Sequence, residues 1–170
     1  TGIDWNTVSA GRLTNIWPPV IDQIKKSPLI GGGRYAMLRK ECFWEILALE
    51  GEVPSHPHNA YLEILVDAGA LGLLLCLTIM AAIIYISGSL MRVRGNPTVA
   101  LLGVVSLIAS VGLLTAAIPG AGFYPSESFV PYLVVWGAAL RVYSERRARA
   151  MAVNTSAPAL EHTLAEASHR

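Results

Sequence analysis

The sequence is poor in charge and in cysteine, and each shortage excludes a class of protein. Only 15% of the residues are charged and the net charge is +1, so no basic face is available to neutralise the phosphates of a nucleic acid. Of the two cysteines, Cys42 lies in a polar stretch and Cys76 in an apolar run, and neither has the spacing of a metal or redox site. We therefore expect no nucleic-acid partner and no disulfide between these cysteines.

Hydrophobic residues are abundant instead, at 53%, and they are concentrated after the first third of the chain. Residues 1–67 carry six Lys/Arg and eight Asp/Glu, whereas between Ala68 and Glu127 the only charged residues are Arg92 and Arg94. This composition is typical of a membrane protein with a polar head and an apolar body. The first residue is a threonine and no signal-peptide pattern follows it, so we expect a fragment of a larger polytopic protein.

Three apolar segments predict membrane spans. Residues 68–91 form about 36 Å of uncharged helix, enough to cross a hydrocarbon core of about 30 Å. Residues 97–118 follow a Gly-Asn-Pro turn, and residues 126–143 form a shorter third segment. Because arginines follow the first and third segments, the positive-inside rule places residues 1–67 outside and residues 144–170 in the cytoplasm, as a disordered tail or a loose helix. The predicted fold is an all-α membrane protein, with an external helical loop domain before two to three transmembrane helices.

The head, residues 1–67, is predicted to fold as short helices and loops. We expect one helix over residues 4–17, a second that starts at the Pro18-Pro19 pair, a flexible turn after Pro28, and a third helix over residues 35–49. The residues expected on the apolar faces are Val20, Ile21 and Ile24 of the second helix and Met37, Leu38, Cys42, Ile46 and Leu49 of the third.

Titratable side chains gather where the head meets the first span, in the stretch SHPHNAYLEILVDAG. Pro57 favours the first turn of a helix, which predicts a helix start at Pro57 or Asn59, with the N-terminus outside the membrane. The positive end of the helix dipole favours an anion there and disfavours protonation of His58. A neutral His58 beside an anion site is a usable general base.

Asn59, Glu63 and Asp67 are spaced four residues apart and share one face of this helix. Carboxylates so close to hydrocarbon need a wet cavity or a cationic partner, so this stripe is predicted to face a site. The alternative is that both carboxylates simply contact water in the headgroup region. His56 and His58 could also chelate a metal, with Glu50 and Glu52 as oxygen ligands, but no further His or Cys completes such a site, and we expect none.

Arg12 and Arg34 are the candidate anion-binding residues. Arg34 follows three glycines, whose flexible backbone lets a phosphate approach closely. Guanidinium forks suit a diphosphate better than lysine does. The alternatives are a solvated helix face for Arg12 and an ordinary loop charge for Arg34.

Two segments, SAGRLTNIWPPVIDQIKKSPLIGGG and HNAYLEILVDAGALGLLL, resemble the O-antigen ligase and Wzy-type polymerase family of bacterial membrane glycosyltransferases. The resemblance covers residues 9 to about 90. The residues that carry it are Gly11, Arg12 and Trp17, then Ser27, Pro28, Leu29, Gly31 and Gly33, then His58, Asn59, Leu62 and Glu63, then Gly69 and Gly72.

The resemblance implies a metal-independent, inverting transfer of a glycan from a polyprenyl-diphosphate carrier to an acceptor hydroxyl, without a cofactor. The reaction would take place at the outer face of the bacterial cytoplasmic (inner) membrane, with residues 1–67 in the periplasm, in lipopolysaccharide or surface polysaccharide biosynthesis. By this resemblance, Arg12 stands at the position of the arginine that holds the diphosphate, and His58 at that of the base or orienting group. Asn59 and Glu63 belong to the same motif as His58, and Arg34 is added as a substrate-binding residue from its place after the glycines.

The implied partners are the lipid-linked glycan donor, a lipid or glycan acceptor, and membrane lipids. A repeat-unit polymerase or a protein O-oligosaccharyltransferase of the same family is the alternative for the acceptor. A polysaccharide or lipid transporter subunit is the alternative from another functional class, and it would have more polar residues at the membrane midplane.

Overall fold

A computed structural model of the chain describes residues 11–120 and 129–168, with the backbone alone described for residues 153–168. Every regular element in these ranges is a helix, which confirms the predicted all-α class. The elements are η1 (Arg12–Ile16), α2 (Trp17–Lys26), α3 (Ala36–Arg39), α4 (Cys42–Glu50), α5 (Ala60–Met91), α6 (Pro97–Ala116) and α7 (Val130–Ser168). They divide into two compact units, one of Thr1–Ala82 with Ala109–Val130 and one of Ile83–Ile108 with Pro131–Arg170.

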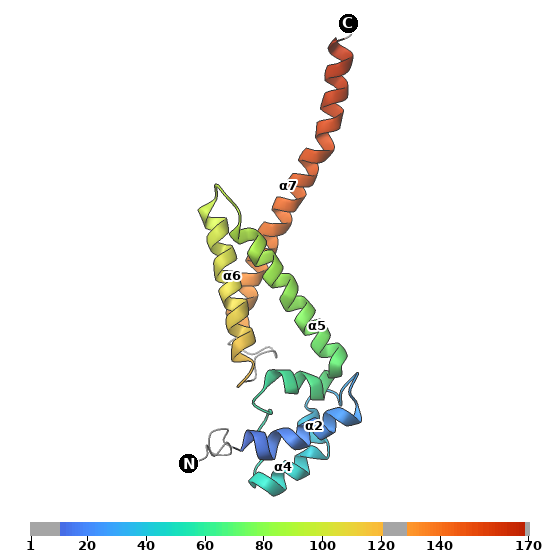
Figure 1. The fold of residues 1–170 in the computed structure, drawn as a ribbon, viewed down its shortest axis with the longest axis vertical. Helices are drawn as coiled ribbons and strands as arrows, with labels where there is room; N and C mark the ends of the chain where they lie inside the picture. The colour runs from blue at the N-terminus through green and yellow to red at the C-terminus, as the bar shows by residue number, and fades with distance from the viewer. Residues whose placement is uncertain (1–10, 121–128, 169–170) are drawn as a thin grey trace, which may run out of the picture. The chain divides into compact units, whose positions relative to one another are not determined.

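The first unit contains the head, in which η1, α2, α3 and α4 surround one apolar core (Figure 1). α2 and α4 lie side by side, and η1 runs directly into α2. The core consists of Ile16, Val20, Ala36, Met37, Cys42, Ile46 and Val66. Because Val66 belongs to α5, this core attaches the first long apolar helix to the head.

The helices of the head differ from the prediction in two places. α2 begins at Trp17 and takes both prolines into its first turn, where no N–H donor is needed, so η1 and α2 are not separated at Pro18. The predicted helix over residues 35–49 is split into α3 and α4, because Lys40 is extended (φ −107°, ψ 178°). Of the predicted 4–17 helix, residues 4–10 lie outside the described part of the chain.

The split between α3 and α4 changes which side chains are buried. Met37, Cys42 and Ile46 reach the core as predicted, whereas Leu49 remains 57% exposed. On α2 the buried side is formed by Val20 and Gln23, while Ile21 is 39% exposed. The periodicity thus identified most of the core, and the two errors are Leu49, in the last turn of α4, and Ile21, which is only just exposed.

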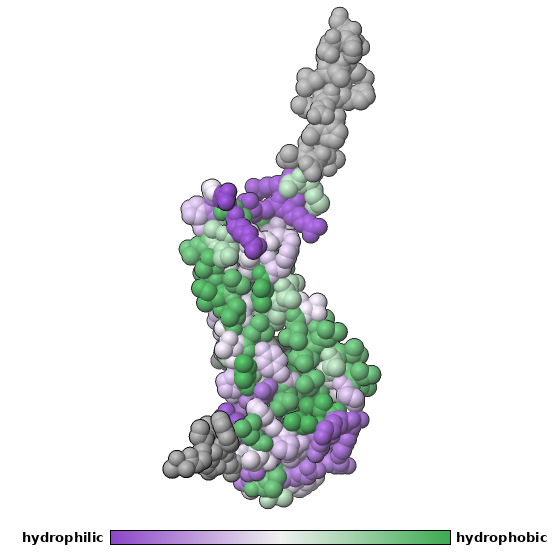
Figure 2. Space-filling model, in the orientation of Figure 1, coloured by the Kyte–Doolittle hydropathy of each residue, from purple (hydrophilic) through white to green (hydrophobic). Residues whose placement is uncertain are grey.

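α5 and α6 are the two helices of the described residues that are long and apolar enough to cross a membrane. Only 11% and 22% of their most apolar windows are buried within the chain, so their surfaces need another apolar environment (Figure 2). α7 does not meet the same criterion over the described residues, and the third span stays a prediction. Its backbone remains helical to Ser168, where a disordered tail or a loose helix was expected.

Within the first unit, the start of α5 is hydrogen bonded to the end of α6. The N–H of Ala60 donates to the carbonyl of Ala117 (2.9 Å), and the hydroxyl of Tyr61 donates to the carbonyl of Leu114 (2.8 Å). The first N–H groups and the last carbonyls of a helix have no partner within that helix. These two bonds supply partners from the neighbouring helix end. The N-terminus of α5 and the C-terminus of α6 therefore lie together, next to the head.

α5 is broken at Gly69, whose φ of 66° and ψ of −168° are accessible essentially to glycine alone. In an unbroken helix, the N–H groups of Ala70 and Leu71 would donate to the carbonyls of Val66 and Asp67. The break opens these bonds, which in a membrane-facing helix is tolerated when a neighbouring segment supplies new partners.

The loop after α2 supplies all four partners. The N–H groups of Gly32 and Gly33 donate to the carbonyls of Val66 and Asp67, each at 2.8 Å. The N–H groups of Ala70 and Leu71 donate to the carbonyls of Pro28 and Leu29, at 2.8 and 3.1 Å. Residues 28–33 and 66–71 are thus paired through their backbones, and we call this pairing the loop–helix junction.

Contact at the loop–helix junction is so close that it requires glycine on both sides. A Cβ atom on Gly69 would lie 2.3 Å from the backbone of Leu29, and one on Gly31 would lie 2.5 Å from the backbone of Asp67. Neither backbone can withdraw without losing the hydrogen bonds of the junction. The glycines shared with the family motif therefore have a structural cause.

We expect Gly69→Ala to lower the free energy of unfolding by about 2–5 kcal/mol, from backbone strain together with overpacking. Gly51→Ala is the matched control, because Gly51 also has a positive φ (75°) but a Cβ there would meet nothing within 4 Å. The control should lose about 1–2 kcal/mol. Denaturant unfolding followed by circular dichroism measures both, and equal losses would contradict the role given to the junction.

Candidate functional site

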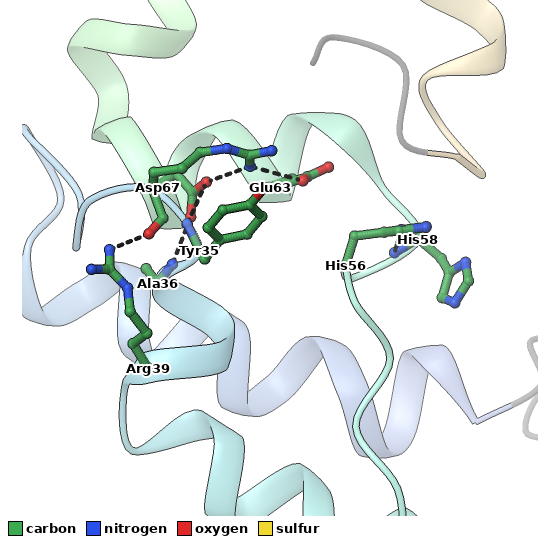
Figure 3. A network of polar contacts seen from close by, with 8 residues as sticks. Tyr35, Ala36, Arg39, His56, His58, Glu63 and Asp67 are labelled. Atoms are coloured by element: carbon green, nitrogen blue, oxygen red, sulfur yellow. Dashed lines mark hydrogen bonds and ion pairs between the residues drawn. The ribbon is translucent and has the colours of Figure 1, made fainter. Parts of the chain in front are cut away.

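The two histidines lie on the loop that leads into α5, and α2 holds this loop in place. The indole N–H of Trp17 donates to the carbonyl of Pro57 (2.9 Å), between the histidines. The N–H of His58 donates to Nδ1 of His56 (3.1 Å), and the two rings meet edge to face with centroids 4.4 Å apart. His58 has a left-handed backbone (φ 53°). This turn in the loop sets the positions of both imidazoles (Figure 3).

α5 begins at Ala60, slightly later than the predicted start at Pro57 or Asn59, because Asn59 caps it. The side-chain oxygen of Asn59 accepts from the N–H groups of Tyr61 and Leu62, both at 3.0 Å. Its amide NH₂ group keeps its donor capacity toward a ligand. Asn59 therefore has a structural role as the N-terminal cap of α5. Its contact with substrate stays a prediction.

Arg12 lies close enough to both histidines for its charge to act on them. Burial lowers the pKa of His56 below 6.5, and the charge of Arg12 lowers it further. Burial is also the main cause that lowers the pKa of His58, followed by the charges of His56 and Arg12. His58 is therefore neutral near pH 7, as the sequence predicted, although the causes are burial and cationic neighbours in addition to any helix dipole.

The tertiary structure thus brings together residues that lie more than 40 positions apart in the sequence. Arg12 comes from η1, and the histidines come from the loop before α5. A neutral imidazole can accept a proton and a guanidinium can bind a phosphate oxygen, so these side chains have the chemistry that the predicted roles require. Sequence analysis named Arg12 and His58 but missed Trp17 as the residue that joins their two segments.

We expect His56→Asn to raise the pKa of His58, because it removes a like-charged neighbour, while burial keeps that pKa below 6.5. Titration of the imidazole protons by NMR measures the midpoint in the wild type and the variant. Lys25→Gln is the matched control, since Lys25 pairs with Asp22 on the exposed side of α2 and is not among the groups that shift His58. A midpoint above 6.5 in the wild type would contradict the burial of His58.

Arg34 and the two carboxylates of α5 form a second cluster. The guanidinium of Arg34 lies 3.1 Å from Asp67 Oδ2 and 3.4 Å from Glu63 Oε1, and it stacks over the ring of Tyr35 at 4.1 Å. The Asp67 carboxylate also accepts from the N–H groups of Tyr35 and Ala36, at the start of α3 (Figure 3). The predicted carboxylate stripe therefore has a cationic partner from the head.

Arg34 has partners in the chain, but it is not enclosed by them. Its side chain remains 43% exposed, whereas those of Glu63 and Asp67 are 11% and 4% exposed. One oxygen of Glu63, Oε2, is buried and has no hydrogen-bond partner among the described residues. A buried carboxylate oxygen of this kind is a ready acceptor for a ligand hydroxyl.

Asp67→Asn should lower the free energy of unfolding by about 1–3 kcal/mol, because it removes the charge of the ion pair and replaces one of the two oxygens that accept backbone N–H groups by an NH₂ group. Most of the loss should come from the backbone N–H groups, since an ion pair to a half-exposed arginine contributes less than about 1 kcal/mol. Asp22→Asn is the control, because its pair with Lys25 is exposed. Chemical denaturation compares the two, and a loss as small for Asp67 as for Asp22 would contradict this assignment.

The two histidines are also the candidate metal ligands named from the sequence. Among the side chains described for residues 11–120 and 129–152, no group of three or more His, Cys, Asp or Glu gathers closely enough to hold a metal ion. The imidazole Nδ1 of His56 instead accepts from the backbone N–H of His58, as described above. Independence from metal stays a prediction.

Comparison with known proteins agrees with the motifs. Residues 5–77 match the family model described as O-Antigen ligase, a range that includes the loop–helix junction and both clusters. No curated protein and no solved structure matches the chain. The match and the two apolar helices confirm the resemblance: residues 5–77 are similar to the O-antigen ligase and Wzy-type family of membrane glycosyltransferases.

Proposed function

We propose that this chain takes part in transferring a glycan from a polyprenyl-diphosphate carrier to an acceptor hydroxyl at the outer face of the bacterial cytoplasmic membrane. The observation that carries the proposal is the juxtaposition of Arg12 with a neutral His58 at the mouth of an apolar helix. Such a transfer needs a cation for the leaving diphosphate, a base for the acceptor, and a site where lipid and sugar meet.

The residues have separate roles in this reaction. The acceptor hydroxyl attacks the anomeric carbon, its proton passes to the imidazole of His58, and the bond from that carbon to the diphosphate oxygen breaks. The carrier diphosphate leaves with the bonding electron pair, which the guanidinium of Arg12 stabilises. Attack opposite the leaving group inverts the anomeric configuration, and no step calls for a metal ion.

The second cluster lies on the same helix as this site and suits the binding of sugar. Glu63 Oε2 accepts a hydrogen bond from a glycan hydroxyl, and the amide of Asn59 donates one. Arg34 holds the Glu63 carboxylate in place, and the exposed part of its side chain is available to contact the ligand. In this arrangement Arg34 positions Glu63 as well as contacting substrate.

The orientation of the chain follows from its charges. The head precedes α5, and Arg92 and Arg94 follow its last residue, Met91. The positive-inside rule places the arginines in the cytoplasm and therefore the head in the periplasm. The site then faces the leaflet from which a lipid-linked glycan is delivered.

The transporter alternative receives less support from the helices. Of the hydroxyl residues in α6, Ser106 bonds to Ser87 of α5 (2.7 Å) and Thr115 bonds to the carbonyl of Val111 within its own helix. The first bond joins two helices through their side chains, as small polar residues do between membrane helices, and the second satisfies a carbonyl of the same helix. A conduit would need polar groups directed into a water-filled path.

The test is glycan transfer in membrane vesicles that contain the full-length protein and a polyprenyl-diphosphate-linked donor. His58→Ala should lower the rate by about 10²–10⁴-fold through loss of the base. Arg12→Ala should lower it by about 10²–10³-fold through loss of charge stabilisation. Lys25→Ala, which removes an exposed charge of the same head, should leave the rate unchanged.

Unchanged transfer by the His58 or Arg12 variant, with insertion and fold intact, would refute the proposal. Addition of EDTA tests the metal, since loss of transfer that a divalent ion restores would assign a metal to the histidines. The product identifies the acceptor: a single glycan on a lipid indicates a ligase, a lengthened glycan a polymerase, and a modified protein an oligosaccharyltransferase.

A further inference from the structure

The second unit contains a pocket that the proposed reaction does not use. It lies between the last turns of α5 and the middle of α7 and has a volume of about 570 Å³. Its lining residues are Tyr85, Ser89, Leu90, Val93, Tyr143, Arg146 and Arg147. The rings of Tyr85 and Tyr143 meet edge to face with centroids 6.5 Å apart, so the two helices approach each other at this pocket.

The chemistry of the pocket suits an anionic group with several oxygens. Of the described residues that line it, two carry guanidinium groups and two carry phenol hydroxyls, and none is acidic. The nearest carboxylate along α7, Glu145, is paired with Arg141 at 2.9 Å. The charges of Arg146 and Arg147 are therefore not compensated by that neighbour, and guanidinium groups bind phosphate oxygens through two parallel hydrogen bonds.

The position of the pocket selects a lipid over a soluble ligand. Tyr85 and Ser89 lie in the last turns of α5, a helix apolar enough to span a membrane, and the charged residues Arg92 and Arg94 follow directly. Tyrosine and arginine at the end of a span are typical of the level of the lipid headgroups. Figure 2 shows a strongly hydrophilic region at the turn after α5, next to the apolar helices.

Exposed apolar side chains for acyl chains are available on the helices of the same unit. Tyr85 is 67% exposed, Leu101 of α6 61% and Leu140 of α7 55%. A free phosphate would use the arginines alone, whereas a phospholipid would use these side chains as well. Basic pockets between helices on the cytoplasmic side are suited to anionic headgroups.

We propose that Tyr85, Tyr143, Arg146 and Arg147 form a binding site for the phosphate headgroup of an anionic phospholipid. The arginines bind the phosphate, the phenol hydroxyls donate to its remaining oxygens, and the acyl chains lie along the exposed apolar side chains. The site belongs to the second unit and shares no residue with the His58 cluster, so its occupancy can be measured without reference to glycan transfer.

Native mass spectrometry of the delipidated full-length protein in detergent tests the site, with phosphatidylglycerol as the probe and phosphatidylcholine as the zwitterionic comparison. The double variant Arg146→Gln/Arg147→Gln should weaken phosphatidylglycerol binding by about tenfold to thirtyfold. Tyr85→Phe/Tyr143→Phe, which keeps the rings, should weaken it by about twofold to tenfold. All variants lie on exposed or half-exposed helix faces, where the fold tolerates them.

Arg149→Gln is the matched control, because Arg149 belongs to the same run of arginines on α7 but does not line the pocket. It should change binding by no more than about twofold. Equal loss in Arg149→Gln and the double variant would overturn the proposal in favour of diffuse charge attraction. Equal binding of phosphatidylcholine, or full competition by glycerol phosphate at the same concentration as the lipid, would overturn the assignment to an anionic lipid.

Discussion

The backbone pairing between the loop at residues 28–33 and the break in α5 is the constraint on which the head depends. It replaces the two hydrogen bonds that an unbroken helix would form there with four, and so makes a break at the edge of an apolar helix stable. Glycine is required in both paired segments because their backbones are in contact. The pairing also fixes the position at which α5 breaks and its first turns join the head.

Both polar clusters follow from this junction. With the loop held against α5, Arg34 reaches the carboxylates of Glu63 and Asp67, and Asp67 receives the first N–H groups of α3. The same core that contains Val66 holds α2, from which Trp17 reaches the carbonyl of Pro57. The histidine loop is thereby positioned beside Arg12, so the geometry of the proposed site is a consequence of packing in the head.

Local pattern was sufficient for the class of the protein and for most of its elements. Long uncharged stretches identified α5 and α6, and helical periodicity identified Met37, Cys42 and Ile46 as core. The split between α3 and α4 was not predictable, because no glycine or proline marks Lys40. That break serves the packing of Met37 and Ile46 against a core whose other members are distant in the sequence.

For the site, the sequence alone determined that titratable groups would gather at the start of an apolar helix, because the order of residues in one segment fixes their spacing along a helix. It also indicated a neutral His58. Only the tertiary structure decided which charges meet: Arg34 pairs with residues up to 33 positions away, and Trp17 bonds to a carbonyl 40 positions away. Contacts over such separations depend on how the core packs and on where the backbone of α5 opens. Those features arise from the whole fold of the head and from no single segment of it.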